Sequence, residues 1–314
     1  MSSNMPFPKI RLVFMGTPEF AVPSLEILLA HNYEVVAVVT APDKPQGRGR
    51  SVMPSPVKVA ARTYNIPVLQ PTNLEAPAFL ETLKSYHATL QVVVAFRILP
   101  QIVWAMPTLG TFNLHASLLP QYRGAAPINW AIINGEQETG VTTFFLEQTL
   151  DTGHILFQEQ ESIYAYDTAG TLHDRLQYKG AQLVLKTVQA IEQGNYTTKN
   201  QVPTQESLRK KAPKIYKKAC QISWDQKVED VLNFIRGLSP YPAAWSLFNG
   251  RTYKILFAEK ATMASPRLNP GEVHSDGKRY VHVGTQSAPL AIKVLQLAGK
   301  KPMEVQEFLR GHCI

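Results

Sequence analysis

The feature that most constrains the fold is the opening alternation of apolar runs with a glycine turn. Residues 10–15 are apolar and break at Gly16-Thr17-Pro18, after which apolar residues recur at helical spacing over residues 20–29. A second, valine-rich run covers residues 34–40. This order predicts a strand, a turn, a helix and a second strand, which is the βαβ unit of a doubly wound parallel sheet.

The glycine turn does not match a dinucleotide site. The Gly-x-Gly-x-x-Gly pattern needs a second and a third glycine, and Gly16-Thr17-Pro18 lacks both. Asp43 follows a loop entrance, whereas the acidic residue that binds a ribose follows a plain strand end. The sequence therefore argues against NAD binding.

Further strands and helices alternate as far as Gly194. Apolar runs predict strands at residues 66–69, 90–96, 111–115 and 141–146, and helical spacing predicts helices from residue 56 and at residues 76–86, 101–106, 124–133 and 168–193. We therefore expect an α/β domain over residues 1–194, with a Rossmann-like, doubly wound and mostly parallel sheet.

The character of the chain changes after Gly194. Residues 195–219 are polar and predict a basic linker, with a single glutamate facing the cations Lys199, Arg209, Lys210, Lys211, Lys214, Lys217 and Lys218 within residues 199–218. A helix is expected at residues 227–238, followed by short alternating runs at residues 244–248, 252–259, 279–283 and 290–296. Such runs predict a small β-barrel domain over residues 220–314.

Composition narrows the class of protein. The 314 residues are 45% hydrophobic and 18% charged, and the apolar runs are far shorter than the roughly 20 residues of a membrane span. No basic segment followed by an apolar one opens the chain, so we expect a cytoplasmic protein without a membrane partner. Cys220 and Cys313 lie in no metal-binding array, which predicts no metal site. The net charge of +8 suggests a polyanionic partner.

Residues 41–51 carry prolines, glycines and cations without an apolar period, which predicts an exposed loop. One interpretation is a solvated surface connection, since charged loops are common. The other is a phosphate-binding loop, because Gly47 and Gly49 allow close backbone approach while Arg48 and Arg50 offer forked donors. Composition alone leaves both open.

Three polar residues are candidates for chemistry. Asn113 and His115 are two positions apart on a predicted strand and so point to the same face, and Asp151 lies in the turn Leu150-Asp151-Thr152-Gly153. That turn could bring a carboxylate beside the imidazole. A structural role is the alternative, because Asp-Thr-Gly is a common turn and a His two residues from an Asn is more often structural than catalytic.

Several motifs, in this order along the chain, carry a family resemblance. They are Met15-Gly16-Thr17-Pro18-Glu19-Phe20-Ala21-Val22-Pro23, Lys44-Pro45-Gln46-Gly47-Arg48-Gly49, Met53-Pro54-Ser55-Pro56-Val57-Lys58, Asn113-Leu114-His115-Ala116-Ser117-Leu118-Leu119-Pro120, Arg123-Gly124-Ala125-Ala126-Pro127 and Leu150-Asp151-Thr152-Gly153. Together they resemble the methionyl-tRNA formyltransferases. The Asn/His motif and the later Asp-x-Gly are shared by the wider folate-dependent formyltransferases, while the Gly47-Arg48-Gly49 loop, the basic linker and the β-domain are similar to the tRNA enzymes.

The resemblance implies an activity and roles. A formyl group would move from 10-formyltetrahydrofolate to the α-amine of methionine esterified to initiator tRNA, without a metal. Asn113 and His115 would stabilise the oxyanion of the tetrahedral intermediate, and Asp151 would orient His115 and help to remove the amine proton. The folate site would be formed by Ser117, Leu118, Leu119, Pro120, Ile98 and Leu99. One departure from the family pattern is Arg97, which stands where a glycine is expected.

The resemblance also implies tRNA contacts and a monomer with an OB-type C-terminal barrel. Arg48, with Gly47, Gly49 and Arg50, would enter the acceptor end, and Lys210, Lys211 and Lys214 would hold the tRNA backbone. The alternatives are a formyltransferase acting on a nucleotide sugar or on glycinamide ribonucleotide, a formyltetrahydrofolate hydrolase, and a non-catalytic RNA-binding protein that retained the fold. An enzyme with a small substrate has less need for a cationic linker and a second domain.

Overall fold

The computed structural model describes residues 9–46, 51–149, 151–201, 210–262, 266–312 and 314. The chain forms two compact units: residues 1–123, 140–161 and 174–210 make up the first, and residues 124–139, 162–173 and 211–314 make up the second. Within the described ranges, no helix has the length and apolar character needed to cross a membrane.

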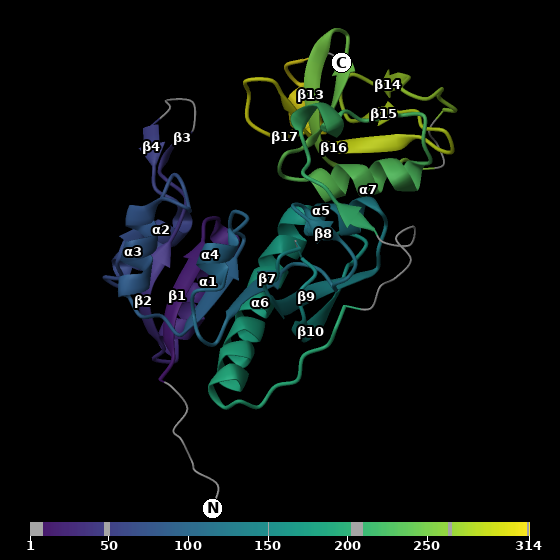
Figure 1. Ribbon diagram of the computed structural model, residues 1–314. Helices are drawn as coiled ribbons and strands as arrows, with labels where there is room; N and C mark the ends of the chain where they lie inside the picture. Colours follow the sequence, from purple (N-terminus) through teal and green to yellow (C-terminus); the bar gives the residue numbers. More distant parts are fainter. Residues whose placement is uncertain (1–8, 47–50, 150, 202–209, 263–265, 313) are drawn as a thin grey trace, which may run out of the picture. The chain divides into compact units, whose positions relative to one another are not determined.

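The first unit is built on a seven-stranded sheet in the order β10-β9-β7-β6-β1-β2-β5. Figure 1 labels β1, β2, β7, β9 and β10 of this sheet. The neighbours from β7 to β5 pair in parallel, and β9 runs antiparallel to β7. The strands are β1 (Arg11–Gly16), β2 (Glu34–Val39), β5 (Val68–Leu69), β6 (Leu90–Val94), β7 (Thr111–His115), β9 (Glu138–Phe145) and β10 (Ile155–Ser162). The predicted Rossmann-like, mostly parallel sheet is confirmed.

Helices between the strands cover this sheet, as expected for strands that are buried on both faces. They are η1 (Glu19–Ala21), α1 (Val22–Ala30), α2 (Pro56–Thr63), α3 (Pro77–Ser85), α4 (Gln101–Trp104) and α6 (Ala169–Glu192), whose residues 174–192 belong to this unit, whereas α5 (Pro127–Ile133) belongs to the second unit. Close packing fixes α6 against the sheet: Gly180 lies so near Leu114 of β7 that a Cβ atom there would approach its side chain to 2.6 Å.

The strand order places a switch point beside β1. From β1 the chain adds β2 and β5 on one side, then returns to add β6 and β7 on the other. In open α/β sheets, ligands bind outside the carboxyl ends of the strands at such a point. Gly16 ends β1 there, and a Cβ atom at Gly16 would lie 3.0 Å from the Val94 carbonyl of β6, so the two strand ends approach closely.

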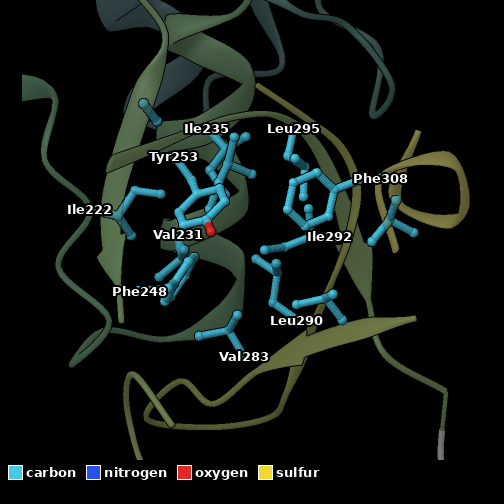
Figure 2. Packing of buried hydrophobic residues seen from close by; sticks show 14 of the residues in the cluster. Ile222, Val231, Ile235, Phe248, Tyr253, Val283, Leu290, Ile292, Leu295 and Phe308 are labelled. Carbon is cyan, nitrogen blue, oxygen red and sulfur yellow. The ribbon is translucent and has the colours of Figure 1, made fainter. Parts of the chain in front are cut away.

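The second unit contains a six-stranded, largely antiparallel sheet, whose main path is β12-β13-β16-β15-β14 and whose strand β17 pairs with β16. The elements are β8 (Arg123–Gly124), β11 (Lys211–Ala212), η3 (Lys217–Cys220), α7 (Val228–Leu238), β12 (Ala244–Phe248), β13 (Arg251–Lys260), β14 (Val273–Ser275), β15 (Val281–Val283), β16 (Leu290–Leu297), β17 (Met303–Glu304) and α8 (Val305–Leu309). Figure 2 shows the core, in which Val231 and Ile235 of α7 face Tyr253, Leu295 and Phe308.

The sequence predicts the elements well where apolar residues are periodic, and less well elsewhere. The predicted loop at residues 41–51 contains a short hairpin, because β3 (Lys44–Gln46) pairs with β4 (Ser51–Met53). The predicted strand at residues 90–96 ends at Val94, since Ala95 adopts a left-handed backbone conformation with φ +47°. The paired strands of the C-terminal sheet run antiparallel, while the closed barrel and the division at residues 194 and 219 stay predictions.

Candidate functional site

Strand β7, which lies between β6 and β9, carries the first two candidate residues near its carboxyl end. Asn113 pairs with Val93 of β6 on one side and Phe144 of β9 on the other, and His115 pairs with Thr142 of β9. The period of two puts both side chains on one face, as predicted. His115 is buried, with 7% of its surface exposed, and Asn113 is half-buried.

A main-chain carbonyl sets the tautomer of His115. The Nε2 atom of His115 lies 2.9 Å from the carbonyl oxygen of Tyr122. A carbonyl can only accept a hydrogen bond, so Nε2 carries the proton. In the neutral imidazole, Nδ1 is then unprotonated, and it can donate a hydrogen bond only when the ring is protonated.

Tyr122 is held in place by the main chain of Lys210, which belongs to the predicted basic linker (residues 195–219). Its backbone is left-handed, with φ +59°, and its N–H donates to the carbonyl of Lys210 at 2.7 Å. The N–H of Lys210 donates in turn to Oε1 of Gln121 at 2.8 Å. Lys210, predicted from its charge as a tRNA contact, therefore also supports the catalytic candidate His115 through its main chain.

The segment Ser117–Pro120 is fixed by polar side chains of β9 and β10. Thr142 donates from its hydroxyl to the Ser117 carbonyl at 2.6 Å and accepts from the Leu119 N–H at 3.2 Å. Gln158 donates to the Leu119 carbonyl at 2.9 Å. Ser117 and Leu119 are buried, whereas Leu118 and Pro120 are half-buried and keep surface that a ligand could contact.

The turn that carries Asp151 is clamped by Gln201. The Gln201 amide donates to the carbonyls of Asp151 and Gly153, both at 2.9 Å, and its own oxygen accepts from Nε of Arg123 at 3.1 Å. Asp151 is buried, with 7% exposure, and its φ of +53° is left-handed. Gly153 is required, because a Cβ atom there would lie 1.7 Å from the Phe145 carbonyl. Sequence reasoning missed Gln201, since nothing distinguishes it within a polar segment.

Arg97 bridges the loop after β6 to the loop after β5. Its guanidinium donates to the carbonyls of Pro71 at 2.7 Å and Thr72 at 3.0 Å and lies 5.3 Å from the centre of the Phe96 ring. Of the two predicted folate residues that follow, Ile98 is 74% exposed and Leu99 is 8% exposed. The departure from glycine thus adds a brace to this strand end, and it presents Ile98 to the surface.

The arginine loop, Gly47 to Arg50, lies outside the described residues, but the base of its hairpin is well anchored. Lys58 of α2, buried with 7% exposure, forms an ion pair with Asp43 at 2.6 Å and donates to Gln70 at 2.6 Å. Gln70 also donates to Asp43 at 2.7 Å. The hydrogen bond from Lys58 is the main reason that the pKa of Asp43 is below its usual range.

The predicted basic residues are exposed. Lys210 lies in the first unit, whereas Lys211 and Lys214 lie in the second. The ammonium of Lys214 sits 5.5 Å from the centre of the Tyr216 ring, a cation–π distance. Among the residues that the structure describes, no group of three or more His, Cys, Asp or Glu side chains could hold a metal ion.

Comparison with known proteins identifies the family of this chain. The family model described as formyl transferase matches residues 9–188, and a model described as formyl transferase, C-terminal domain, matches residues 214–313. A methionyl-tRNA formyltransferase of Azobacteroides pseudotrichonymphae is 51% identical over 313 residues, covering 97% of each chain. The chain belongs to the methionyl-tRNA formyltransferase family. The predicted family resemblance is confirmed.

Solved structures show how widely this formyltransferase fold occurs. A crystal structure of HypX from Aquifex aeolicus in complex with tetrahydrofolic acid has a TM-score of 0.65 at 18% identity, covering 97% of this chain and 48% of that one. A crystal structure of WlaRD, a sugar 3N-formyl transferase, has a TM-score of 0.66 at 21% identity, covering 94% and 100%. The two formyltransferase family matches are separated by residues 189–213, which include much of the basic segment.

Proposed function

We propose that this protein transfers the formyl group of 10-formyltetrahydrofolate to the α-amine of methionine on initiator tRNA. The observation that carries the proposal is the 51% identity to a methionyl-tRNA formyltransferase, because it spans 97% of both chains and so includes both units. The candidate residues at the end of β7 supply suitable chemistry. The product is N-formylmethionyl-tRNA, which serves translation initiation.

The reaction needs donors for an oxyanion. The amine attacks the formyl carbon, a tetrahedral intermediate forms with negative charge on the formyl oxygen, and the bond from carbon to N10 then breaks. Each donor placed for that oxygen contributes about 3–4 kcal/mol in acyl-transfer enzymes. Asn113 supplies one donor through its amide.

His115 supplies the second donor through a ring N–H, and the Tyr122 carbonyl 2.9 Å from Nε2 holds the ring in place. Asp151 orients His115 and takes the proton of the attacking amine, directly or through water, before N10 leaves with a proton. Protons and bonds then balance with no further reactant.

Within this proposal, the exposure of each predicted folate residue decides its role in the folate site. Leu118, Pro120 and Ile98 offer apolar surface to a planar ring system, while the buried Ser117, Leu119 and Leu99 shape the backbone behind them. Arg97 is a positioning residue in this proposal, because it fixes the loop that carries Ile98.

The same proposal includes the residues that contact the tRNA and the division of the chain into domains. Gly47, Arg48, Gly49 and Arg50 enter the acceptor end, and Lys210, Lys211 and Lys214 hold phosphates. Residues 1–194 serve as the catalytic domain, residues 195–219 as the basic linker and residues 220–314 as a tRNA-binding domain of OB type. The protein acts as a monomer in the cytoplasm.

A direct assay tests the proposal. The full chain is incubated with methionyl initiator tRNA and 10-formyltetrahydrofolate, and N-formylmethionine is detected by mass spectrometry. We expect product from the natural sequence and a rate lower by roughly 10²–10⁴ in His115→Ala. Absence of product with the natural sequence would overturn the proposal, and tRNA binding without product would favour a non-catalytic RNA-binding protein.

A further inference from the structure

The second unit contains a cavity of about 600 Å³ that the proposed chemistry does not use. All its lining residues belong to that one unit. Cavities of about 300–1,000 Å³ are typical of sites for small molecules. The volume is therefore sufficient for a ligand larger than a water molecule or a simple ion.

A row of three side chains from adjacent strands forms part of its wall. Trp245 of β12 is opposite Lys254 of β13, and Lys254 is opposite Gln296 of β16. The period of two sends this row to one face of the sheet. The neighbouring row, Ala244, Ile255 and Leu295, points to the other face and lies in the core, where Figure 2 labels Leu295.

The cavity is strongly cationic. Lys214, Lys217 and Lys254 all line it, and no aspartate or glutamate of the described ranges does. None of the three ammonium groups forms an ion pair with a described carboxylate. Because three lysines without a compensating acid repel one another, the cavity favours an anionic occupant.

Aromatic and amide groups accompany the lysines. Tyr241 lines the cavity with 81% of its surface exposed, so its ring is accessible to a ligand. The indole N–H of Trp245 donates to the Lys217 carbonyl at 2.9 Å, which ties the segment that carries two of the lysines to β12. Aromatic faces next to cations are the combination that holds a nucleobase and its phosphate.

We propose that this cavity binds a single nucleotide, its phosphate on Lys214, Lys217 and Lys254 and its base against Tyr241 and Trp245. The nucleotide is an unpaired residue of the tRNA. This part of the inference rests on the proposed function, because it takes tRNA to be the acceptor. The same chemistry would accept a free 5′-mononucleotide, and the experiment separates these two sources.

The test uses the full chain and two probes, AMP by isothermal titration calorimetry and deacylated initiator tRNA by fluorescence anisotropy. The variants are Lys254→Gln, which removes a charge from the cavity, and Tyr241→Ala, which removes an exposed ring. Lys260→Gln is the matched control on the same strand, because Lys260 lies outside the cavity and pairs with Glu229. Thermal melting of each variant checks the fold.

We expect Kd for tRNA to rise about tenfold or more in Tyr241→Ala, and in Lys254→Gln with a salt dependence reduced by about one phosphate contact. AMP should bind, compete with tRNA and lose affinity in both variants, while Lys260→Gln stays unchanged. Altered AMP binding with unaltered tRNA binding would identify a free nucleotide as the ligand. If neither probe responds to either variant, the cavity is not a nucleotide site, even if the natural sequence still makes N-formylmethionine.

Discussion

At the scale of single residues, hydrogen bonds to the main chain decide what the polar side chains can do. The Tyr122 carbonyl fixes the proton of His115 on Nε2, and the amide of Gln201 holds the turn of Asp151. Arg97 likewise donates hydrogen bonds from two guanidinium nitrogens to the carbonyls of Pro71 and Thr72. These partners lie between 7 and 50 residues away in the sequence, and no local pattern marks them, so the candidate residues could be predicted from the sequence while their supports could not.

Replacing Arg97 by alanine tests its role as a brace. Removal of both hydrogen bonds should free the loop that carries Ile98 and raise KM for 10-formyltetrahydrofolate by about tenfold. KM for methionyl-tRNA should stay unchanged, because no tRNA contact is proposed there. Steady-state formylation with each substrate varied in turn measures the difference.

Arg97→Lys is the companion variant. Lysine keeps the charge but lacks the fork that reaches two carbonyls, so it should restore only part of the folate KM. A uniform loss of activity that tracks a fall in melting temperature would instead show that Arg97 serves stability alone.

At the scale of elements, the long and strongly periodic segments are predictable, whereas several of the short ones are not. Strand β6, for example, is buried at each of its positions and stands out in the sequence as a largely apolar run. The strand β14 has three half-buried residues and exists through its pairing with β15, and β3 exists through its pairing with β4. Local sequence carries no record of such pairing. The face shared by Asn113 and His115 was predictable, because it depends only on strand period.

The turn after β9 offers a test at this scale. In Gly153→Ala, the new Cβ atom would lie 1.7 Å from the Phe145 carbonyl, so the turn that holds Asp151 must move. We expect a loss of stability of about 1–3 kcal/mol and a fall in kcat of more than tenfold. Urea unfolding and single-turnover formylation measure the two effects.

Gly311→Ala is the matched control, since a Cβ atom at Gly311 meets nothing within 4 Å. It should leave both quantities near those of the natural sequence. Equal behaviour of the two variants would contradict the view that Gly153 shapes the turn that carries Asp151.

At the scale of the whole molecule, the chain combines a formyltransferase unit with a second unit and a basic segment. This fold is not tied to one acceptor, because the structure of a sugar 3N-formyl transferase matches 94% of this chain at only 21% identity. The choice of acceptor therefore depends on parts that the fold does not specify. The candidate acceptor-binding parts, the arginine loop and the lysines of the basic linker, could be predicted from the sequence, because a cluster of charges can be recognised without knowing the fold.

Arg48→Ala tests whether the arginine loop selects the acceptor. Loss of a forked donor should raise KM for initiator methionyl-tRNA or lower kcat, about tenfold in kcat/KM, while binding of 10-formyltetrahydrofolate stays intact. Formylation kinetics and a folate titration give the two values. Arg310→Ala is the control, an exposed arginine on a distant segment of the sequence. Unchanged kinetics with initiator tRNA in Arg48→Ala would show that the loop is a surface connection.

The hydrogen bonds from Lys210 through Tyr122 to His115 limit how this enzyme can diversify. The basic segment is not an interchangeable module, because its main chain holds the carbonyl that sets the imidazole proton. A lineage that acquires a different acceptor by replacing this segment must also keep a residue at the position of Lys210 whose carbonyl meets the Tyr122 N–H. The side chain at position 210 can therefore change when the acceptor changes, whereas the position of its main-chain carbonyl must be kept for His115 to stay in place.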